Sequence, residues 1–160
     1  MTWIDETRVA LIGGNKGQTL IIDTNDFSMK MGPNTTYYES VWHSCAKFSH
    51  QGKDLVIVIG GISRHGEVAS TQIWDPTSDQ GWKKGPDLPN PCSYSSAVIQ
   101  ETSEGEVVLV MGCNENPEKI YQLSDSPGGQ LKWGTLSLEL EHPRSTLVAM
   151  MIPEEFSHCN

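Results

Sequence analysis

The sequence lacks a long hydrophobic run and has little positive charge. No stretch approaches the ~18 consecutive apolar residues of a membrane-spanning helix, and the first ten residues already contain two acids and one base. We therefore expect no transmembrane helix, no signal peptide and no membrane partner, and a cytoplasmic location. Twenty acidic residues against 11 Lys and Arg give a net charge of −9. This charge repels phosphate, so we also expect no nucleic-acid partner.

The spacings of metal sites and of common catalytic motifs are missing too. The four cysteines include no Cys-x-x-Cys pair, which predicts reduced thiols, at least two of them in core strands, rather than a zinc site or a disulfide framework. The five histidines show no His-x-x-x-His or His-Glu-x-x-His spacing, and there is no Gly-x-Ser-x-Gly or phosphate-loop motif. The expectation is a protein without enzymatic activity, cofactor or metal.

What the sequence does contain is a repeat. Three short apolar runs end on glycine: Val9–Gly14, Val56–Gly61 and Val108–Cys113. Their first glycines are 47 residues apart (13 to 60) and then 52 residues apart (60 to 112). Periods near 50 residues are typical of the blades of a β-propeller.

The spacing within the units places their length difference in a loop. From the glycine pair to the acid that follows the next apolar strand, the separation is 9 residues in the first unit (Gly14 to Asp23) and 14 in the second (Gly61 to Asp75). Insertions cost least in loops, so this five-residue excess fits a structural repeat. The apolar runs are short, rich in β-branched residues and separated by Gly or Pro, which predicts strands and no helix.

The third unit is degenerate but can be followed. It contains Ile120–Gln122, Leu131–Trp133 and Pro143–Met150. Between them, Leu136–Glu141 alternates apolar and polar residues, and this period of two predicts the outer strand of the unit.

These features resemble the kelch repeat, whose marks are a strand closed by two glycines, an acid after the next strand, then a Trp and a Pro-rich bend. The resemblance implies an all-β fold: a kelch-type β-propeller segment of about three four-stranded antiparallel blades in an incomplete ring. Residues 1–160 would form a single kelch-repeat region, with repeats at about 8–54, 55–106 and 107–152 and a C-terminal tail at 153–160. The residues that carry the motif are Gly13, Gly14, Asp23, Gly60, Gly61, Trp74, Asp75, Trp82, Gly112, Tyr121 and Trp133.

Each motif residue has a physical role in this interpretation. The glycines allow a tight blade edge and a close approach of neighbouring chain. Asp23 and Asp75 are expected to accept backbone N–H bonds in the turn after their strand. The tryptophans should pack in the layer between blades; these are Trp42, Trp74, Trp82 and Trp133.

The family's strand lettering, a to d from the inside of a blade outward, makes Arg8–Gly14 a b strand. The chain then reads b-c-d, a-b-c-d, a-b-c-d and a final a strand at Thr146–Ile152, which is twelve strands offset by one. An open arc leaves strand edges unpaired. We therefore expect either a piece of a longer propeller or a homodimer, in which the last strand of one copy completes the first blade of the other.

The function expected from this resemblance is a non-catalytic scaffold that binds a protein or peptide ligand. In kelch propellers the ligand face is formed by the b–c and d–a loops. On these loops, cationic and aromatic candidates for an acidic peptide are Tyr38, Arg64, His65, Tyr94 and Arg144. By analogy, such a propeller recruits substrates for a ubiquitin-ligase adaptor. The alternatives are a copper radical oxidase-like propeller, using Tyr and Cys residues such as Tyr37 and Cys92, and an extracellular glycan-binding propeller.

Overall fold

The computed structural model describes residues 1–14, 16–36 and 41–151. This part of the chain is all β and contains no helix, so it has no helix that could cross a membrane. It forms three four-stranded sheets and one small hairpin. Sheet 1 consists of β1 (Thr2–Trp3), β2 (Arg8–Gly13), β3 (Gln18–Asp23) and β4 (Met29–Met31); sheet 2 of β5 (Ser44–His50), β6 (Lys53–Ile59), β9 (Thr71–Trp74) and β10 (Lys83–Lys84); sheet 3 of β11 (Ser96–Thr102), β12 (Gly105–Met111), β13 (Lys119–Asp125) and β14 (Leu131–Glu139); the hairpin of β7 (Ile62–Ser63) and β8 (Gly66–Glu67).

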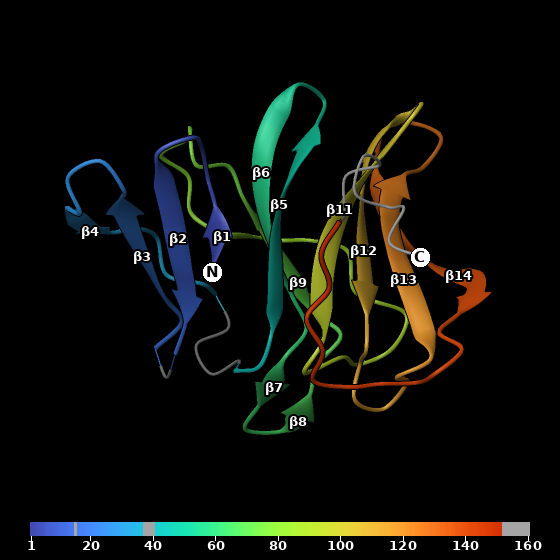
Figure 1. Ribbon diagram of the computed structural model, residues 1–160. Helices are drawn as coiled ribbons and strands as arrows, with labels where there is room; N and C mark the ends of the chain where they lie inside the picture. Colours follow the sequence, from blue (N-terminus) through green and yellow to red (C-terminus); the bar gives the residue numbers. More distant parts are fainter. Residues whose placement is uncertain (15, 37–40, 152–160) are drawn as a thin grey trace, which may run out of the picture.

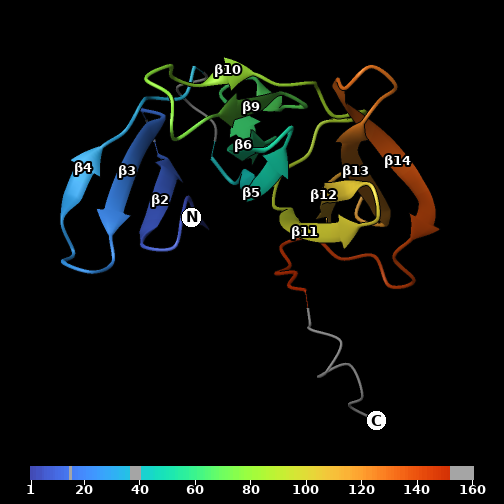
Figure 2. The ribbon, with the colours of Figure 1, turned by 90° about the horizontal axis from the view of Figure 1, so that it is seen from above.

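The three sheets share one topology. In each, the strands follow one another in chain order and every pair is antiparallel. The sheets stand side by side (Figure 1) and radiate from a common centre, with β5 and β11 inside and β4, β10 and β14 at the periphery (Figure 2). The predicted all-β class with four-stranded antiparallel sheets is confirmed.

The sheets pack face to face through alternating side chains. We call the side of a sheet that is turned toward the next sheet in the chain its forward face, and the opposite side its backward face. The forward face of sheet 1 meets the backward face of sheet 2 in a cluster formed by Ile4, Ala10, Ile21, Val56, Val58, Trp74 and Trp82. The forward face of sheet 2 meets sheet 3 in a larger cluster, which includes Phe48, Ile57, Ile59, Val108, Val110, Tyr121 and Trp133. Burial of these apolar side chains is the main stabilising contribution between sheets.

Three of the four predicted core tryptophans lie in these layers. Trp74, Trp82 and Trp133 are buried, which confirms the prediction for them. The indole N–H of Trp82 donates to Thr19 Oγ1 and to the carbonyl of Pro33, both at 3.1 Å, and so ties sheet 2 to sheet 1. Tyr121 is also buried; its hydroxyl donates to Asn90 Oδ1 at 3.2 Å, and burial raises its pKa.

The two predicted turn aspartates accept backbone bonds as expected. Asp23 Oδ1 accepts the N–H of Asn25, and Asp75 Oδ1 accepts the N–H of Thr77, both at 2.9 Å. The hydroxyl and N–H of Thr77, with a smaller contribution from Lys53, lower the pKa of Asp75. Both carboxylates therefore stabilise the turns that follow their strands.

The glycines at the ends of β2, β6 and β12 are required by backbone conformation. Gly13, Gly60 and Gly112 have φ values of +121°, +64° and +74°, a region that favours glycine. A Cβ at Gly60 would collide with the carbonyl oxygen of Cys92, in the segment that leads into sheet 3. At Gly112 a Cβ would lie 2.8 Å from the carbonyl oxygen of Arg144, in the segment that leaves sheet 3. The glycines thus let the next segment of chain lie directly against the sheet.

The predicted offset of the strands is wrong at both ends of the described chain. Sheet 1 has its own inner strand, because Thr2 and Trp3 of β1 pair with Ala10 and Val9 of β2. At the other end, the described residues of the predicted final strand, 146–151, form no strand. The sequence pattern missed β1 because its paired segment is only two residues long.

The structure also shows where the predicted insertion and the predicted outer strand lie. The five-residue excess of the second unit is the β7–β8 hairpin, inserted between β6 and β9. The predicted outer strand at Leu136–Glu141 is the later part of the longer strand β14, which ends at Glu139.

The close contact at Gly60 leads to a test of stability with an internal control. Gly52 also has a positive φ, +72°, but a Cβ there would meet nothing within 4 Å. Gly52→Ala should therefore cost only the strain of a left-handed alanine, about 1–2 kcal/mol. Gly60→Ala adds a collision with backbone and should lower the free energy of unfolding by at least about 2 kcal/mol more. Urea unfolding of the two variants measures the difference; equal losses would show that Cys92 does not press on Gly60.

Candidate functional site

The loops predicted to carry function gather at one end of the sheets. The loops after β2, β6 and β12, and the segments that enter β5 and β11, all lie at the lower end in Figure 1. The tight turns between β5 and β6 and between β11 and β12 lie at the upper end. We call the lower end the loop end.

A backbone ladder joins the loop end across the three sheets. Trp42, Tyr94 and Thr146 are 52 residues apart (42, 94 and 146), and their φ values are +56°, +57° and +57°. The N–H of Tyr94 donates to the carbonyl of Trp42 at 3.0 Å, and the N–H of Thr146 donates to the carbonyl of Tyr94 at 3.1 Å. Positive φ is unfavourable for bulky residues and concentrates at functional sites. The ladder therefore marks these three positions as candidates for function. The repeat defined by the glycines did not reveal them.

The ladder carries an aromatic pair, of which Trp42 is exposed and Tyr94 half-buried. The rings of Trp42 and Tyr94 stack with centroids 4.9 Å apart and planes 24° apart. Trp42 is 55% exposed, so its predicted place in the core is wrong. It precedes β5 in a left-handed conformation and lies on the connecting segment rather than on a sheet face. Tyr94, predicted as a binding residue, is its partner, and Trp42 is the aromatic that sequence reasoning missed.

The β7–β8 hairpin stands next to this pair. Val41 and Ile62 form a bridge, with N–H to carbonyl distances of 3.1 and 2.8 Å, which fixes the base of the hairpin beside Trp42. The hairpin turn carries two predicted binding residues, Arg64 and His65, and both are exposed. Arg64 Nε donates to His65 Nε2 at 2.9 Å. The structure thus brings cationic and aromatic groups to one region of the loop end.

The half-buried side chain of Glu67 anchors the hairpin from the other side. Glu67 Oε1 accepts hydrogen bonds from Ser93 Oγ at 2.8 Å and from Asn114 Nδ2 at 2.9 Å. Its second oxygen, Oε2, is buried and has no hydrogen-bond partner in the described part of the chain. The hairpin is therefore tied to both segments of sheet 3 that reach the loop end. No sequence motif pointed to Glu67 as a functional or structural residue.

The remaining predicted binding residues are less central. Arg144 is exposed and lies two residues before Thr146 of the ladder. Tyr38 lies outside the described residues. The structure therefore places the Arg64–His65 turn on a hairpin whose base is bridged to Val41, next to the stacked Trp42 and Tyr94. It places Arg144 near the end of the same ladder.

A disulfide lies next to the ladder in the chain, because Cys92 is two residues before Tyr94. Cys92 and Cys113 are bonded, with Cα atoms 4.8 Å apart, and both are fully buried. The prediction of reduced thiols is wrong for this pair. The bond joins the segment entering β11 to the residue after Gly112, a contact that depends on the folded repeat and not on sequence spacing. Cys45 is a free thiol, and Cys159 lies outside the described residues.

The disulfide bears on the copper-oxidase alternative. That alternative needs a cysteine sulfur to form a thioether with a tyrosine, and the sulfur of Cys92 is already bonded to Cys113. Among the residues described, no three His, Cys, Asp or Glu side chains come together as a metal site. Tyr37 lies outside the described part of the chain.

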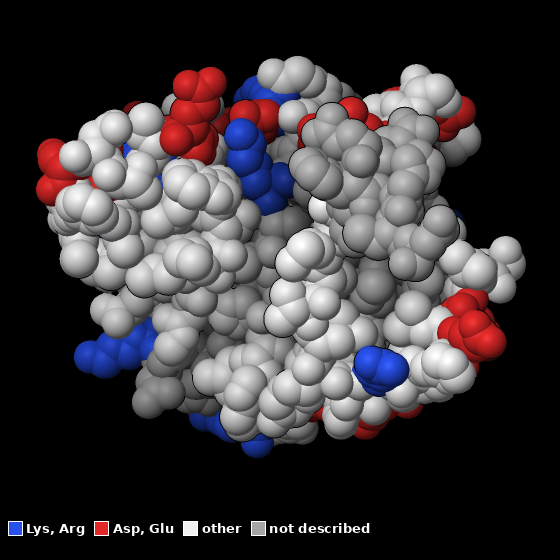
Figure 3. All heavy atoms as spheres, in the orientation of Figure 1, with Lys and Arg blue, Asp and Glu red and all other residues white. Residues whose placement is uncertain are grey.

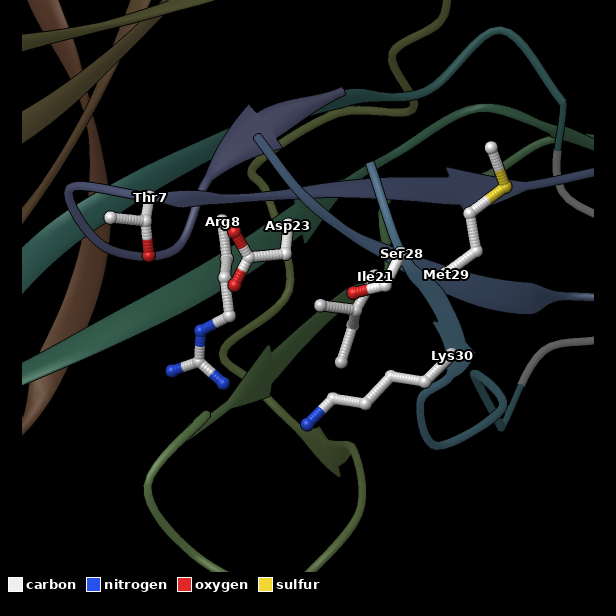
Figure 4. Close-up of a pocket in the computed structure, with 7 residues that line it drawn as sticks. All are labelled: Thr7, Arg8, Ile21, Asp23, Ser28, Met29 and Lys30. Carbon is white, nitrogen blue, oxygen red and sulfur yellow. The ribbon is translucent and has the colours of Figure 1, made fainter. Parts of the chain in front are cut away.

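The surface also has hollows away from the loop end. One of about 380 Å³ is lined by Thr7, Arg8, Ile21, Asp23, Ser28, Met29 and Lys30 (Figure 4). Arg8 Nε donates to Asp5 Oδ2 at 2.6 Å, a bond that lowers the pKa of Asp5. Asp23 holds its own turn. Arg8 and Asp23 of this hollow are thus engaged in structure, and we place the candidate site at the loop end.

Removing the disulfide should loosen the loop end measurably. The bond closes a loop of 21 residues, for which loop entropy gives about 3 kcal/mol of stabilisation. Cys92→Ala/Cys113→Ala should lower the free energy of unfolding by about that amount, and Cys45→Ala, the control, by much less. Urea unfolding measures both. Peptide mapping without reduction should recover Cys92 and Cys113 in one linked fragment, and alkylation of both thiols in the unreduced protein would contradict the assignment.

No protein-family model matches the chain, and no curated protein sequence matches it.

Proposed function

We propose that the chain is a kelch-type β-propeller segment that acts as a non-catalytic scaffold for binding a protein or peptide ligand. Three repeated four-stranded antiparallel sheets, arranged around a centre, support the blade interpretation (Figure 2). Two further features support it. A glycine with positive φ stands at the end of the second strand of each sheet, and Trp74, Trp82, Tyr121 and Trp133 are buried between sheets. Rigid sheets with function on their loops are typical of such scaffolds.

The stack of exposed Trp42 on half-buried Tyr94, on the same end of the sheets as the Arg64–His65 turn, carries the binding proposal. Trp and Tyr bury a large area on binding at a small entropy cost and dominate many interfaces. Arg64 adjacent to this pair adds a group that binds carboxylates. The ligand that fits this chemistry is a peptide with an apolar or aromatic residue next to an acidic one. The stack would take the apolar residue, and the turn of the hairpin would hold the acid.

The structure also bears on where such a scaffold works. Buried disulfides persist in oxidising compartments and are rare in the cytosol. The Cys92–Cys113 bond therefore favours the extracellular version of the proposal over the cytoplasmic one. A ubiquitin-ligase adaptor, which works in the cytosol, is supported only by analogy.

Glycan binding is the second candidate, and the exposed Trp42 favours it specifically. A flat indole face, 55% exposed, offers a stacking surface for a sugar ring. The cationic hairpin turn has no role in that case unless the sugar is acidic. The two ligand classes therefore predict different effects of the Arg64 substitution.

The proposal is tested by selecting ligands and then removing the site. A random peptide library displayed on phage is panned on the purified chain, and selected peptides are titrated by calorimetry against four proteins. Trp42→Ala should weaken binding at least tenfold, by about 2 kcal/mol. Arg64→Ala should weaken it less, and more at low than at high salt. The control, Glu104→Ala in the turn between β11 and β12, should bind like the unaltered chain.

Arg64 and Trp42 are both exposed, so neither change should unfold the chain. Peptides that bind the Trp42→Ala variant as well as the unaltered chain would overturn the assignment of the site. If no peptide is enriched and a glycan array gives a signal that depends on Trp42 but not on Arg64, the glycan alternative replaces the peptide.

A further inference from the structure

The backward face of sheet 1 is apolar and uncovered. In its strands this face consists of Trp3, Val9, Leu11, Gly13, Gln18, Leu20, Ile22, Met29 and Met31, none of them charged. Trp3 is 53% exposed, Leu11 39%, Met29 65% and Met31 57%. The space-filling view shows a continuous uncharged surface over β2, β3 and β4 (Figure 3). Monomeric soluble proteins rarely expose a patch of this kind.

The strand register shows what the same positions do in the other sheets. In sheet 1, Val9 pairs with Ile22, and Ile22 with Met29. The corresponding pair in sheet 2 is Val56 with Trp74, whose ring lies 5.6 Å from that of Trp82. In sheet 3, Val108 pairs with Leu123, and Leu123 with Trp133.

All of these counterparts are buried, because the forward face of the preceding sheet covers them. The backward face of sheet 1 is thus a third copy of a surface that this chain buries twice. Met29 stands where sheets 2 and 3 have a buried tryptophan.

The other end of the chain offers the complementary surface. The forward face of sheet 3 carries Leu109, Met111 and Gln122 at positions that in sheet 1 are Ala10, Ile12 and Ile21, which pack against sheet 2. Past sheet 3, the segment at 144–147 crosses Gly112, with Leu147 Cδ2 2.6 Å from the Cβ position. The segment before sheet 3 crosses Gly60 in the same way, through Cys92. The chain therefore leaves sheet 3 along the path that elsewhere leads to another sheet.

We propose that a second copy of this chain covers the backward face of sheet 1 with the forward face of its sheet 3. Each contact would repeat the two junctions already present within the chain. Because the two surfaces differ and lie at opposite ends of the arc (Figure 2), two copies make the contact twice and close into a dimer. A peptide fits this face less well, because the face is broad and carries no charged strand residue to orient a short ligand.

The proposal is tested by light scattering on a sizing column with the purified 160-residue chain. The unaltered chain should elute as a dimer at micromolar concentration. Met29→Glu places a charge on the backward face of sheet 1 and should raise the Kd at least tenfold. Gln122→Glu does the same on the forward face of sheet 3 and should have a similar effect. Met29→Trp, which restores the residue of the other two sheets, should lower the Kd.

Gln80→Glu is the matched control, because Gln80 is exposed on the connection between β9 and β10 of sheet 2, outside both faces. It should leave the dimer intact. Met29 and Gln122 are not buried, so folding should persist in their variants, which circular dichroism checks. A monomeric unaltered chain, or a dimer that tolerates Met29→Glu, would overturn the proposal. So would a dimer lost in Met29→Glu but kept in Gln122→Glu, since the two sheet 1 faces would then meet each other. These outcomes are independent of any loop-end ligand.

Discussion

The arrangement of this protein depends on the contact between a glycine at the end of one sheet and the backbone that leads away toward the next. At Gly60 the contacting atom is the carbonyl oxygen of Cys92, and at Gly112 it is that of Arg144. At Gly13 the close neighbour is the imidazole of His43, which also bonds the carbonyl of Ile12 at 3.1 Å. Because no side chain separates the segments, each sheet is held at a fixed place relative to its neighbour, and the apolar faces can interlock. The faces supply most of the stabilisation, while the glycines fix the geometry in which it is realised.

Much of this could be predicted from the sequence because it repeats. Recurring glycines, recurring apolar runs and an insertion confined to one interval predicted three antiparallel units and the place of the β7–β8 hairpin. Burial of Trp74, Trp82 and Trp133 was expected because a large flat ring packs well between blades. A pattern that recurs is constrained by the fold at every occurrence, so each unit is evidence for the others. Where the pattern occurs once, or rests on two residues, as in β1, the sequence carries no such check.

The errors share a cause. Cys92 and Cys113 are 21 residues apart and meet only in the folded chain, where the segment entering β11 lies against the segment that follows β12. Spacing rules for local motifs could therefore not find their bond. Trp42 was assigned to the core because tryptophan usually is buried, but its positive φ places it on a connecting segment. Backbone conformation of a non-glycine residue leaves no mark in a single sequence. The 52-residue spacing of Trp42, Tyr94 and Thr146 was visible, yet three unlike side chains gave no reason to align them.

The candidate site is found where the repeat is broken. Three equivalent loops on three equivalent sheets would give a loop end without a distinguished region. Among the residues that the structure describes, only sheet 2 carries an inserted hairpin. This hairpin is fixed on one side by Val41 beside Trp42 and on the other by Glu67, which bonds Ser93 and Asn114. A flexible insertion would need no such anchors, and a carboxylate oxygen such as Glu67 Oε2, buried without a hydrogen-bond partner in the described part of the chain, is costly to keep. The cost is understandable if the hairpin must hold Arg64 and His65 at a set distance from the aromatic pair. The repeated sheets and the backbone ladder then act as a rigid base, and the single irregular element determines what that base presents to a ligand.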